Sequence, residues 1–361
     1  MTRRLVMTAD AIGGVWQYAI GLASDLVRAG WSVDLATLGP PPSAAHHAQA
    51  EAAGVTLIDT ALPLDWLATD AAAVVAAADA VARIARARRA DLVQLNQPAL
   101  AIAEFAMPVV AVVHSCVASW WDAVETGPLP PGLAWQRDLT ARGLARADAI
   151  VCPSRAFAAT VQRLYALPAA PHAIHNGRAL PAAIGPLGDR AFTAGRLWDR
   201  AKNVATLDRA AALMTLPFDA AGAAHGPHHE RVELAHLNLL GHLNDDAVAE
   251  RLATRPIFAS AARYEPFGLA VLEAALTGCA LVLADIPTFR ELWDGAATFV
   301  APDDAAAFAH AITDLAADPD RRMASGARAR TRALDYAPAH VTRAMLAVFE
   351  SALGSGARVA A

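Results

Sequence analysis

Two carboxylates lie eight positions apart, on either side of a Pro-Phe-Gly corner: Glu265 before it and Glu273 after it. Pro266 cannot sit inside a helix and Gly268 can take backbone angles closed to other residues, so we expect Glu265 in a loop. The apolar pattern over 269–277 predicts a helix that begins directly after the corner. Glu273 then falls about one turn inside this helix, where its carboxylate can accept two hydrogen bonds from a diol.

The start of this predicted helix offers a contact of a different kind. The backbone amides of Gly268, Leu269 and Ala270 have no partner within the helix, and the aligned peptide dipoles add positive potential there. Such helix starts attract anions, phosphate included. A nucleoside diphosphate-sugar would fit, with its ribose on one glutamate, its sugar hydroxyls near the other and its phosphates on the amides. The alternative is two solvated acids beside an ordinary core helix.

The segment with the two glutamates resembles the E-x7-E motif of the family 4 glycosyltransferases, which are retaining enzymes of the GT-B fold. Other places in the chain resemble the same family, and together these segments span most of the chain. The set of motifs is specific, although no single one is. The resembling segments are the glycine loop Gly13-Gly14-Val15, the first-domain histidine in Val113-His114-Ser115, the run Val151-Cys152-Pro153-Ser154 with His175-Asn176-Gly177, and the Gly-Arg and Lys-Asn positions between Gly195 and Asn203.

The resemblance implies a transferase that needs neither a metal nor a cofactor. It would move a hexosyl-type sugar from a nucleoside diphosphate-sugar to an acceptor hydroxyl. By resemblance, His114 contacts the donor sugar, and Gly13 and Gly14 lie near the donor phosphates and the acceptor. From the residues alone, the alternatives are a core histidine with satisfied hydrogen bonds and a simple glycine turn.

Two cations are predicted near the glutamate corner. Arg196 follows Gly195 directly after a predicted strand, and Lys202 lies six residues on, at the start of the next predicted helix. Together they would neutralise the charge that builds on a departing diphosphate, which a divalent metal does in other glycosyltransferases. The alternative is a pair of surface charges. We assign Glu265 to donor-sugar contact and transition-state support, and Glu273 to the ribose.

The composition narrows the class of protein. The chain of 361 residues is 55% apolar with a mean hydropathy of +0.31, both raised by alanine, and it has a formal charge of −5. That charge argues against a nucleic-acid partner. The three cysteines, Cys116, Cys152 and Cys279, lack C-x-x-C spacing and indicate neither a disulfide framework nor a zinc site, and the resemblance implies that no metal is bound. No apolar run of about 18 residues escapes charge or proline, and no signal-peptide pattern is present, so we expect a cytoplasmic protein.

Arginines gather in two segments, 83–89 and 137–146, the second beside Trp135. Such clusters are usually solvated helix faces. The alternative is a basic patch that meets anionic lipid headgroups or an anionic acceptor. Peripheral contact with the inner face of the membrane therefore stays open beside the cytoplasmic location.

Strand and helix patterns alternate twice along the chain, which predicts two doubly wound α/β domains. The predicted strands of the first domain are 5–8, 33–38, 55–58, 92–96, 109–114 and 149–152, with helices at 16–29, 71–89 and 133–145. Those of the second are 191–194, 218–221, 237–240, 257–260 and 280–284, with helices at 203–214, 245–253 and after the glutamate corner.

We divide the chain into an acceptor-side domain at 1–180, a Pro/Gly-rich linker at 181–190 and a nucleotide-sugar domain at 191–337. The GT-B resemblance implies that the two domains face one another across a cleft and that a helix at 338–353 packs back on the first domain. A flexible tail is predicted at 354–361.

Two other classes remain open on the sequence alone. The protein could be a sugar-nucleotide-binding subunit without transfer activity. It could also be another GT-B enzyme, such as a sugar-nucleotide epimerase or a glycoside phosphorylase, although no context for a pyridoxal-phosphate lysine is found. The donor base, its sugar and the acceptor are left undetermined: a lipid-linked glycan, an exopolysaccharide intermediate and a small metabolite all fit.

Overall fold

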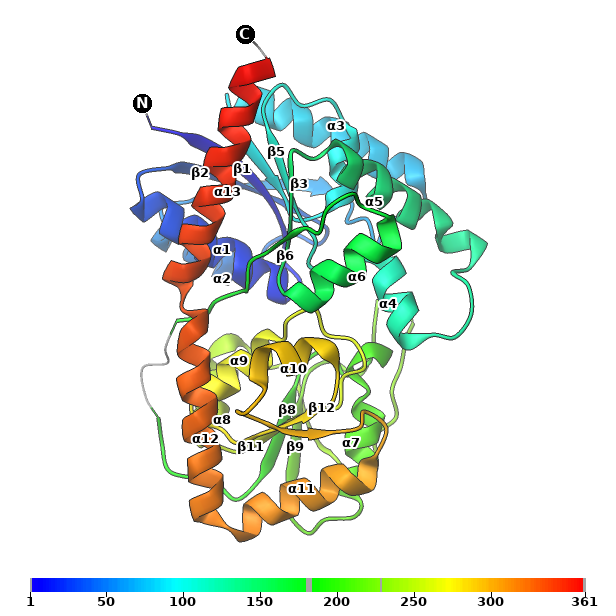
Figure 1. Ribbon diagram of the computed structural model, residues 1–361, viewed down its shortest axis with the longest axis vertical. Helices are drawn as coiled ribbons and strands as arrows, with labels where there is room; N and C mark the ends of the chain where they lie inside the picture. The colour runs from blue at the N-terminus through cyan, green and yellow to red at the C-terminus, as the bar shows by residue number, and fades with distance from the viewer. Residues whose placement is uncertain (1, 180–183, 228, 360–361) are drawn as a thin grey trace. The chain divides into compact units, whose positions relative to one another are not determined.

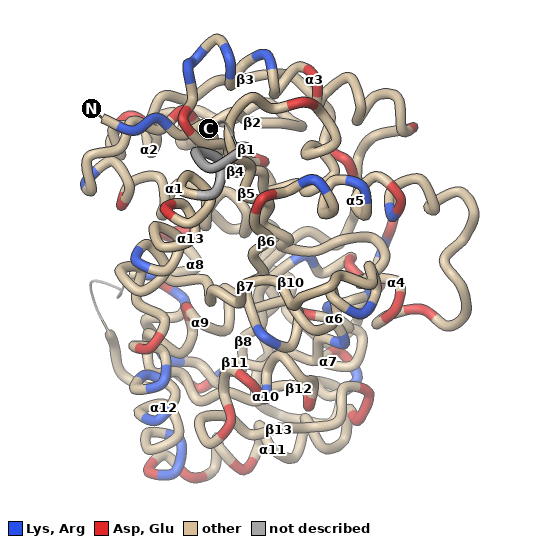
Figure 2. Tube along the Cα trace, turned by 45° about the horizontal axis from the view of Figure 1, so that its top comes forward, with Lys and Arg blue, Asp and Glu red and all other residues tan. Residues whose placement is uncertain are grey.

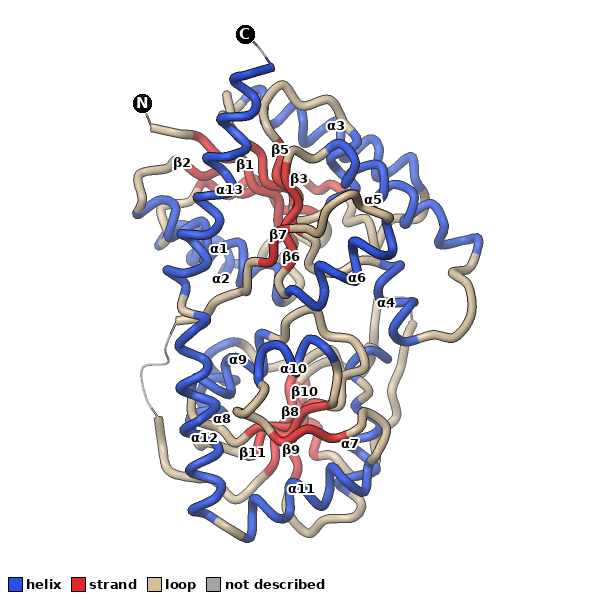
Figure 3. The backbone as a smooth tube through the Cα atoms, viewed as in Figure 1, coloured by secondary structure: helices blue, strands red, loops and turns tan. Residues whose placement is uncertain are grey.

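The computed structural model describes residues 2–179, 184–227 and 229–359, and the chain divides into two units (Figure 1). Unit 1 comprises Met1–Gly177 and Pro338–Ala361, and unit 2 comprises Arg178–Ala337. Each unit is built around one parallel β-sheet with helices packed on it, as the colouring of Figure 3 shows. Each half of the chain therefore has the α/β arrangement that the two alternations predicted.

Within the described residues, the sheet of unit 1 has seven strands in the order β3-β2-β1-β4-β5-β6-β7, and all neighbours pair in parallel. The strand order changes direction between β1 and β4, which is where sheets of this kind bind ligands, beyond the carboxyl ends of the strands. The strands are β1 Arg4–Asp10, β2 Ser32–Leu38, β3 Thr56–Leu62, β4 Leu92–Leu95, β5 Val109–Val112, β6 Ala149–Cys152 and β7 His172–Ala173.

Helices cover the sheet of unit 1, and the C-terminal helix α13 lies alongside α1 (Figure 1). There the Thr342 hydroxyl donates to Asp25 Oδ2 at 2.7 Å, and Met345 and Phe349 join the same apolar cluster as Trp16. The helices are α1 Gly14–Arg28, α2 Ala44–Ala52, α3 Ala71–Ala87, α4 Val117–Val124, α5 Ala134–Arg146, α6 Arg155–Tyr165 and α13 Pro338–Val359, with the short helices η1 Pro98–Ile102 and η2 Pro131–Leu133.

The sheet of unit 2 has six strands in the part of the chain that the structure describes, in the order β10-β9-β8-β11-β12-β13, again all parallel. The change of direction falls between β8 and β11. The strands are β8 Ala191–Ala194, β9 Phe218–Ala221, β10 Asn238–Gly241, β11 Ile257–Ser260, β12 Leu281–Ala284 and β13 Thr298–Val300.

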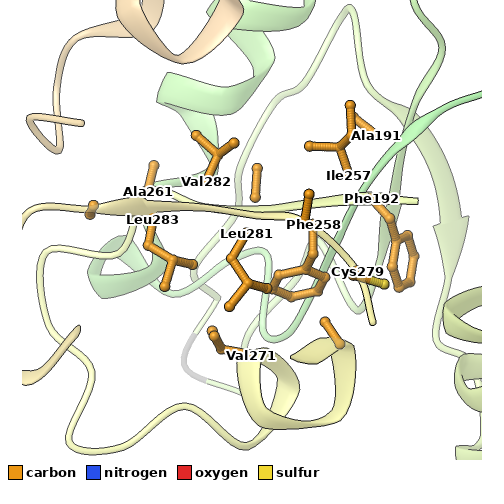
Figure 4. Close-up of a cluster of buried hydrophobic side chains, with 14 of the residues drawn as sticks. Ala191, Phe192, Ile257, Phe258, Ala261, Val271, Cys279, Leu281, Val282 and Leu283 are labelled. Carbon is orange, nitrogen blue, oxygen red and sulfur yellow. The ribbon is translucent and has the colours of Figure 1, made fainter. Parts of the chain in front are cut away.

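The core of unit 2 gathers on both faces of its central strands, because parallel strands covered by helices are apolar on both sides. Figure 4 shows Phe192 and Phe258 from neighbouring strands, with Leu281 and Val271 beside them, all almost fully buried. The helices are α7 Val204–Ala211, α8 Asp245–Ala253, α9 Leu269–Leu276, α10 Pro287–Trp293, α11 Ala305–Ala317 and α12 Pro319–Ala333, with η3 Arg200–Lys202 and η4 Leu334–Tyr336.

Two details differ from the sequence-based division. Unit 2 begins at Arg178, before the predicted linker at 181–190. Residues 181–183 of that linker lie outside the described residues. The amides of Gly185 and Gly188 donate to Ala253 O and Thr254 O of unit 2, so this part of the linker is bonded to unit 2. Helix α13 continues to Val359 and so runs into the segment 354–361, for which a flexible tail stays a prediction. Extending an existing helix avoids the cost of nucleation, so glycines near its end do not stop it. The last two residues, 360–361, lie outside the described residues.

Candidate functional site

The glutamate corner lies in the loop that connects strand β11 to helix α9. Helix α9 begins at Leu269, and its N-cap Gly268 has a φ of 94°. That left-handed angle favours glycine, and a β-carbon there would lie 3.3 Å from Glu265 Cγ. Glu265 therefore lies in the loop and Glu273 in the second turn of the helix, as the sequence predicted.

Lys202 and Glu265 form a direct ion pair. Lys202 ends the short helix η3, and its Nζ contacts Glu265 Oε2, with the two side chains only 22% and 16% exposed. Lys202 is also the only lysine among the 361 residues. The structure thus brings together two residues 63 positions apart that the sequence predicted for one site.

Asn203 fixes the loop that carries Lys202, and sequence reasoning gave it no role. It has a left-handed φ of 51°, and its side-chain amide donates to Ala261 O at 3.1 Å and to Pro302 O at 2.8 Å. The backbone carbonyl of Ala201 accepts a further hydrogen bond at 2.9 Å from the amide of Arg263. These bonds join the Lys202 loop to the segment that leads into Glu265, so the ion pair is set by the backbone on both sides. The only sequence signal was an asparagine after the lysine, since asparagine tolerates left-handed angles.

Arg196 lies at the carboxyl end of strand β8, as predicted, but it points to a different partner. Its Nη2 contacts Asp199 Oδ2 at 2.8 Å, and its guanidinium carbon lies 5.6 Å from the centre of the Trp198 ring. The Arg196 side chain is 47% exposed, whereas that of Asp199 is 4% exposed. Reaching a diphosphate beside Lys202 would therefore require Arg196 to exchange its contact with Asp199 for one with phosphate.

A small pocket opens at the carboxyl ends of β8 and β11, at the point where the strand order of unit 2 changes direction. Lys202 and Glu265 line it together with the start of α9, and both apolar and polar groups contribute. Among the described residues, neither Arg196 nor Glu273 belongs to its lining. The lining residues are Thr193, Ala194, Gly195, Leu197, Lys202, Val204, Phe258, Ser260, Glu265, Gly268, Ala270 and Val271.

Glu273 is held by a partner that the sequence analysis missed. Arg178, the first residue of unit 2, contacts Glu273 Oε1 through Nε at 2.7 Å and through Nη2 at 2.6 Å. Burial raises the pKa of Glu273, and the charge of Arg178 acts in the opposite direction. The two residues are 95 positions apart, and no local pattern links them.

The other predicted site residues belong to unit 1, at the carboxyl ends of its central strands. Gly13 is the N-cap of α1 and Gly14 its first residue; Gly13 has a φ of 91°, and no atom lies within 4 Å of where its β-carbon would be. His114 follows β5, with its Nε2 3.1 Å from Asn96 Oδ1 and its ring edge-on to Tyr18 at 4.6 Å between centroids. His114 is thus part of a polar cluster within unit 1.

The pH dependence of stability tests the environment of His114. Burial lowers its pKa from 6.5 to about 4, so between these pH values the unfolded chain binds a proton that the folded chain does not. The stability it contributes is complete above pH 6.5 and is lost as the pH falls toward 4, by about 3 kcal/mol. We expect urea unfolding of the wild type to lose that much more stability than His114→Asn over this range. Parallel pH profiles for the two proteins would contradict the buried, neutral histidine.

The described residues contain no group of three or more His, Cys, Asp and Glu side chains that could hold a metal ion. In the histidine-rich loop at 225–229, His228 lies outside the described residues. Across the same described part of the chain, no helix combines the length and apolar character needed to cross a membrane.

Two sequence-family models match the chain in succession. Residues 12–180 match the model described as Glycosyltransferase Family 4, and residues 188–318 match the model described as Glycosyl transferases group 1. The two matched ranges follow the two units closely, and together they take in most of the chain.

Among curated proteins, the Phosphatidyl-myo-inositol mannosyltransferase of Mycolicibacterium smegmatis is 32% identical over 127 residues. The match covers 34% of this chain and 33% of the relative, so it spans about a third of the length of that protein.

Solved structures share the fold along the whole chain. Sucrose-phosphate synthase from Thermosynechococcus elongatus has a TM-score of 0.78 at 17% identity, covering 98% of this chain and 100% of that one. Anabaena Alr3699/HepE in complex with UDP-glucose has a TM-score of 0.73 at 18% identity, covering 96% and 99%. At these identities the likeness concerns the fold, and it confirms the predicted class of two Rossmann-like domains in a GT-B chain.

Proposed function

Because the chain belongs to glycosyltransferase family 4, we propose that it transfers a hexosyl-type sugar from a nucleoside diphosphate-sugar to an acceptor hydroxyl. The observation that supports this most directly is the Lys202–Glu265 pair in the pocket at the strand ends of unit 2. A cation and a carboxylate beside the start of a helix suit a ligand with a diphosphate and sugar hydroxyls.

In the proposed reaction, the bond between the anomeric carbon and the diphosphate oxygen breaks while the acceptor oxygen bonds to the same carbon. The acceptor enters on the face from which the diphosphate leaves, so the configuration is retained, and a diphosphate oxygen takes the acceptor proton. Negative charge grows on the diphosphate as it departs. Lys202 and the amides of Gly268, Leu269 and Ala270 would stabilise that charge, with Arg196 joining after release from Asp199.

Glu265 would have two tasks in this scheme. It holds Lys202 in place through their ion pair, and it would accept hydrogen bonds from sugar hydroxyls when the diphosphate shares the lysine. Because Lys202 supplies a fixed positive charge, we propose that transfer needs no divalent metal. In unit 1, His114, Gly13 and Gly14 would serve the donor sugar, the phosphates and the acceptor.

We propose an acceptor that carries a lipid anchor, reached by peripheral contact with a membrane. This is supported by the mannosyltransferase relative, whose name specifies a phosphatidyl-myo-inositol, and by the basic positions on α5, blue in Figure 2. Some arginines of these clusters are already paired: Arg88 with Asp34 at 2.6 Å and Arg137 with Asp138 at 3.0 Å. The other acceptors, an exopolysaccharide intermediate or a small metabolite, need no such surface.

The first test is thermal unfolding with UDP-, GDP- and ADP-sugars, each with and without EDTA. A donor at a hundred times its dissociation constant stabilises the native state by about 2.7 kcal/mol. We expect one nucleotide to raise the melting temperature by several degrees in EDTA, and Glu273→Ala to abolish the shift. Glu250→Ala, an exposed glutamate of α8, is the matched control and should behave as wild type.

The outcomes separate the classes of protein. A shift that disappears in EDTA would contradict metal independence. Binding without transfer or donor hydrolysis across many acceptors would favour a sugar-nucleotide-binding subunit, whereas conversion of the donor sugar without any acceptor would favour an epimerase. No shift with any donor would contradict the proposed site.

A further inference from the structure

Arg178 contacts the Glu273 carboxylate through two nitrogens of its guanidinium group. Its Nε and Nη2 both contact the same oxygen, Oε1, at 2.7 and 2.6 Å, and neither of these two contacts uses Oε2. Each side chain is 25% exposed, so the pair is largely withdrawn from water but reachable. A carboxylate held in this way keeps a fixed orientation, and these two contacts leave its second oxygen unused.

The position of Arg178 is itself fixed by the backbone. Its amide donates to Tyr336 O at 3.3 Å, and the Tyr336 ring packs edge-on against Phe267 of the glutamate corner at 5.7 Å between centroids. The Tyr336 hydroxyl in turn donates to Leu292 O at 2.9 Å. Arg178 is therefore anchored to the same structural unit as the helix that carries Glu273.

Ionisation of Glu273 matters for a diol. An ionised carboxylate accepts on both oxygens, whereas a protonated one is a donor at one of them. Burial and the nearby charge of Asp245 both raise the pKa of Glu273, and Arg178 opposes them. Removing one partner of a pair withdrawn from water leaves the other charge uncompensated, so loss of Arg178 would favour the protonated form.

We propose that Arg178 is a positioning residue for donor binding. By holding Oε1 through two contacts, it orients the Glu273 carboxylate toward the ribose hydroxyls of the nucleotide. The inference rests on the proposed function, since it takes Glu273 as the ribose contact. It adds Arg178, the first residue of unit 2, to the residues that would distinguish ribose from deoxyribose.

The test compares nucleoside diphosphates with their 2′-deoxy forms, using UDP, GDP and ADP and measuring affinity by calorimetry. A hydrogen bond to a charged group contributes enough that the wild type should prefer the ribose form about tenfold or more. In Arg178→Met we expect the preference for ribose to fall below about threefold. In Arg178→Lys we expect an intermediate preference, because lysine keeps the charge but lacks the planar pair of N–H donors of arginine. Arg251→Met, which removes a 3.2 Å contact to Asp219 elsewhere in unit 2, should keep the wild-type preference.

A purely structural ion pair would change stability without changing this preference. Retention of the full ribose preference in Arg178→Met, or in Arg178→Lys if the methionine variant does not fold, overturns the proposal. A wild type that binds the ribonucleotides and deoxyribonucleotides equally well also overturns it, but leaves the transferase assignment standing. A wild type that binds none of them contradicts both.

Discussion

Replacing Lys202 with alanine will lower kcat/KM for sugar transfer about a thousandfold, the size of effect seen when one preorganised group at a developing charge is removed. Lys202 is the cation that lines the pocket, and Asn203 holds its loop rigidly against the segment before Glu265. A charge fixed in advance stabilises the departing diphosphate without reorganisation during the reaction.

The measurement is initial rates of transfer with the donor that the thermal panel selects. Lys202→Ala also leaves the largely buried Glu265 without its partner, so the melting temperature must be compared as well. The double variant Lys202→Met with Glu265→Gln removes both charges and should recover stability but no activity.

In Arg196→Ala we expect kcat/KM to fall only about tenfold to a hundredfold, because the Arg196 guanidinium is more exposed and contacts Asp199. Full activity in both single variants would remove the diphosphate role from this end of the sheet.

Gly222→Ala will destabilise unit 2 by about 3–5 kcal/mol and lower its melting temperature by about 10 °C. Gly222 follows strand β9 with a φ of 141°, and a β-carbon there would lie 1.7 Å from the backbone carbonyl oxygen of Gly195. Backbone atoms cannot rotate away as a flexible side chain can, so the chain on one side must move. The same displacement would shift the turn that begins with Gly195 and carries Arg196, so we expect weaker donor binding where the variant is still folded.

The matched control is Gly295→Ala, a glycine of the same unit with a φ of 76° and no atom within 4 Å of the added carbon. It carries only the cost of a left-handed angle, about 1 kcal/mol. The comparison therefore isolates the contact with Gly195 from backbone strain. Equal melting temperatures for the two variants would show that the close approach of β9 to the Gly195 turn contributes nothing.

The sequence predicted most of the sheets because their strands are short apolar runs between turn residues. Strand β8 and strand β11, for example, lie where the pattern placed them, and the Gly268 corner fixed the start of α9. Strand β7 was not predicted, since it has two residues and both are exposed. In the described sheet β7 lies at the edge and pairs with β6 alone. An exposed edge strand of two residues lacks the apolar pattern that marks a buried strand.

The candidate site was predicted in its residues but only in part in its contacts. The Lys202–Glu265 pair could be predicted because its two motifs follow neighbouring parallel strands, β8 and β11. The carboxyl ends of parallel strands lie at the same edge of the sheet. The partner of Glu273 is different, because Arg178 reaches it from the first residue of unit 2 and belongs to none of the sequence motifs. Likewise, the contact of Arg196 with Asp199 depends on a loop conformation, which side-chain spacing does not determine.

Because the chain contains a single lysine, the pocket can be labelled selectively by amine chemistry. Lys202 is the only lysine, and it lies beside Glu265 in the pocket. Reductive methylation with a carbon-13 reagent would therefore label one side chain besides the α-amino group, while every arginine stays unmodified. The methyl resonance of Lys202, identified by its absence in Lys202→Met, would report on whatever occupies the pocket and whichever nucleotide binds there.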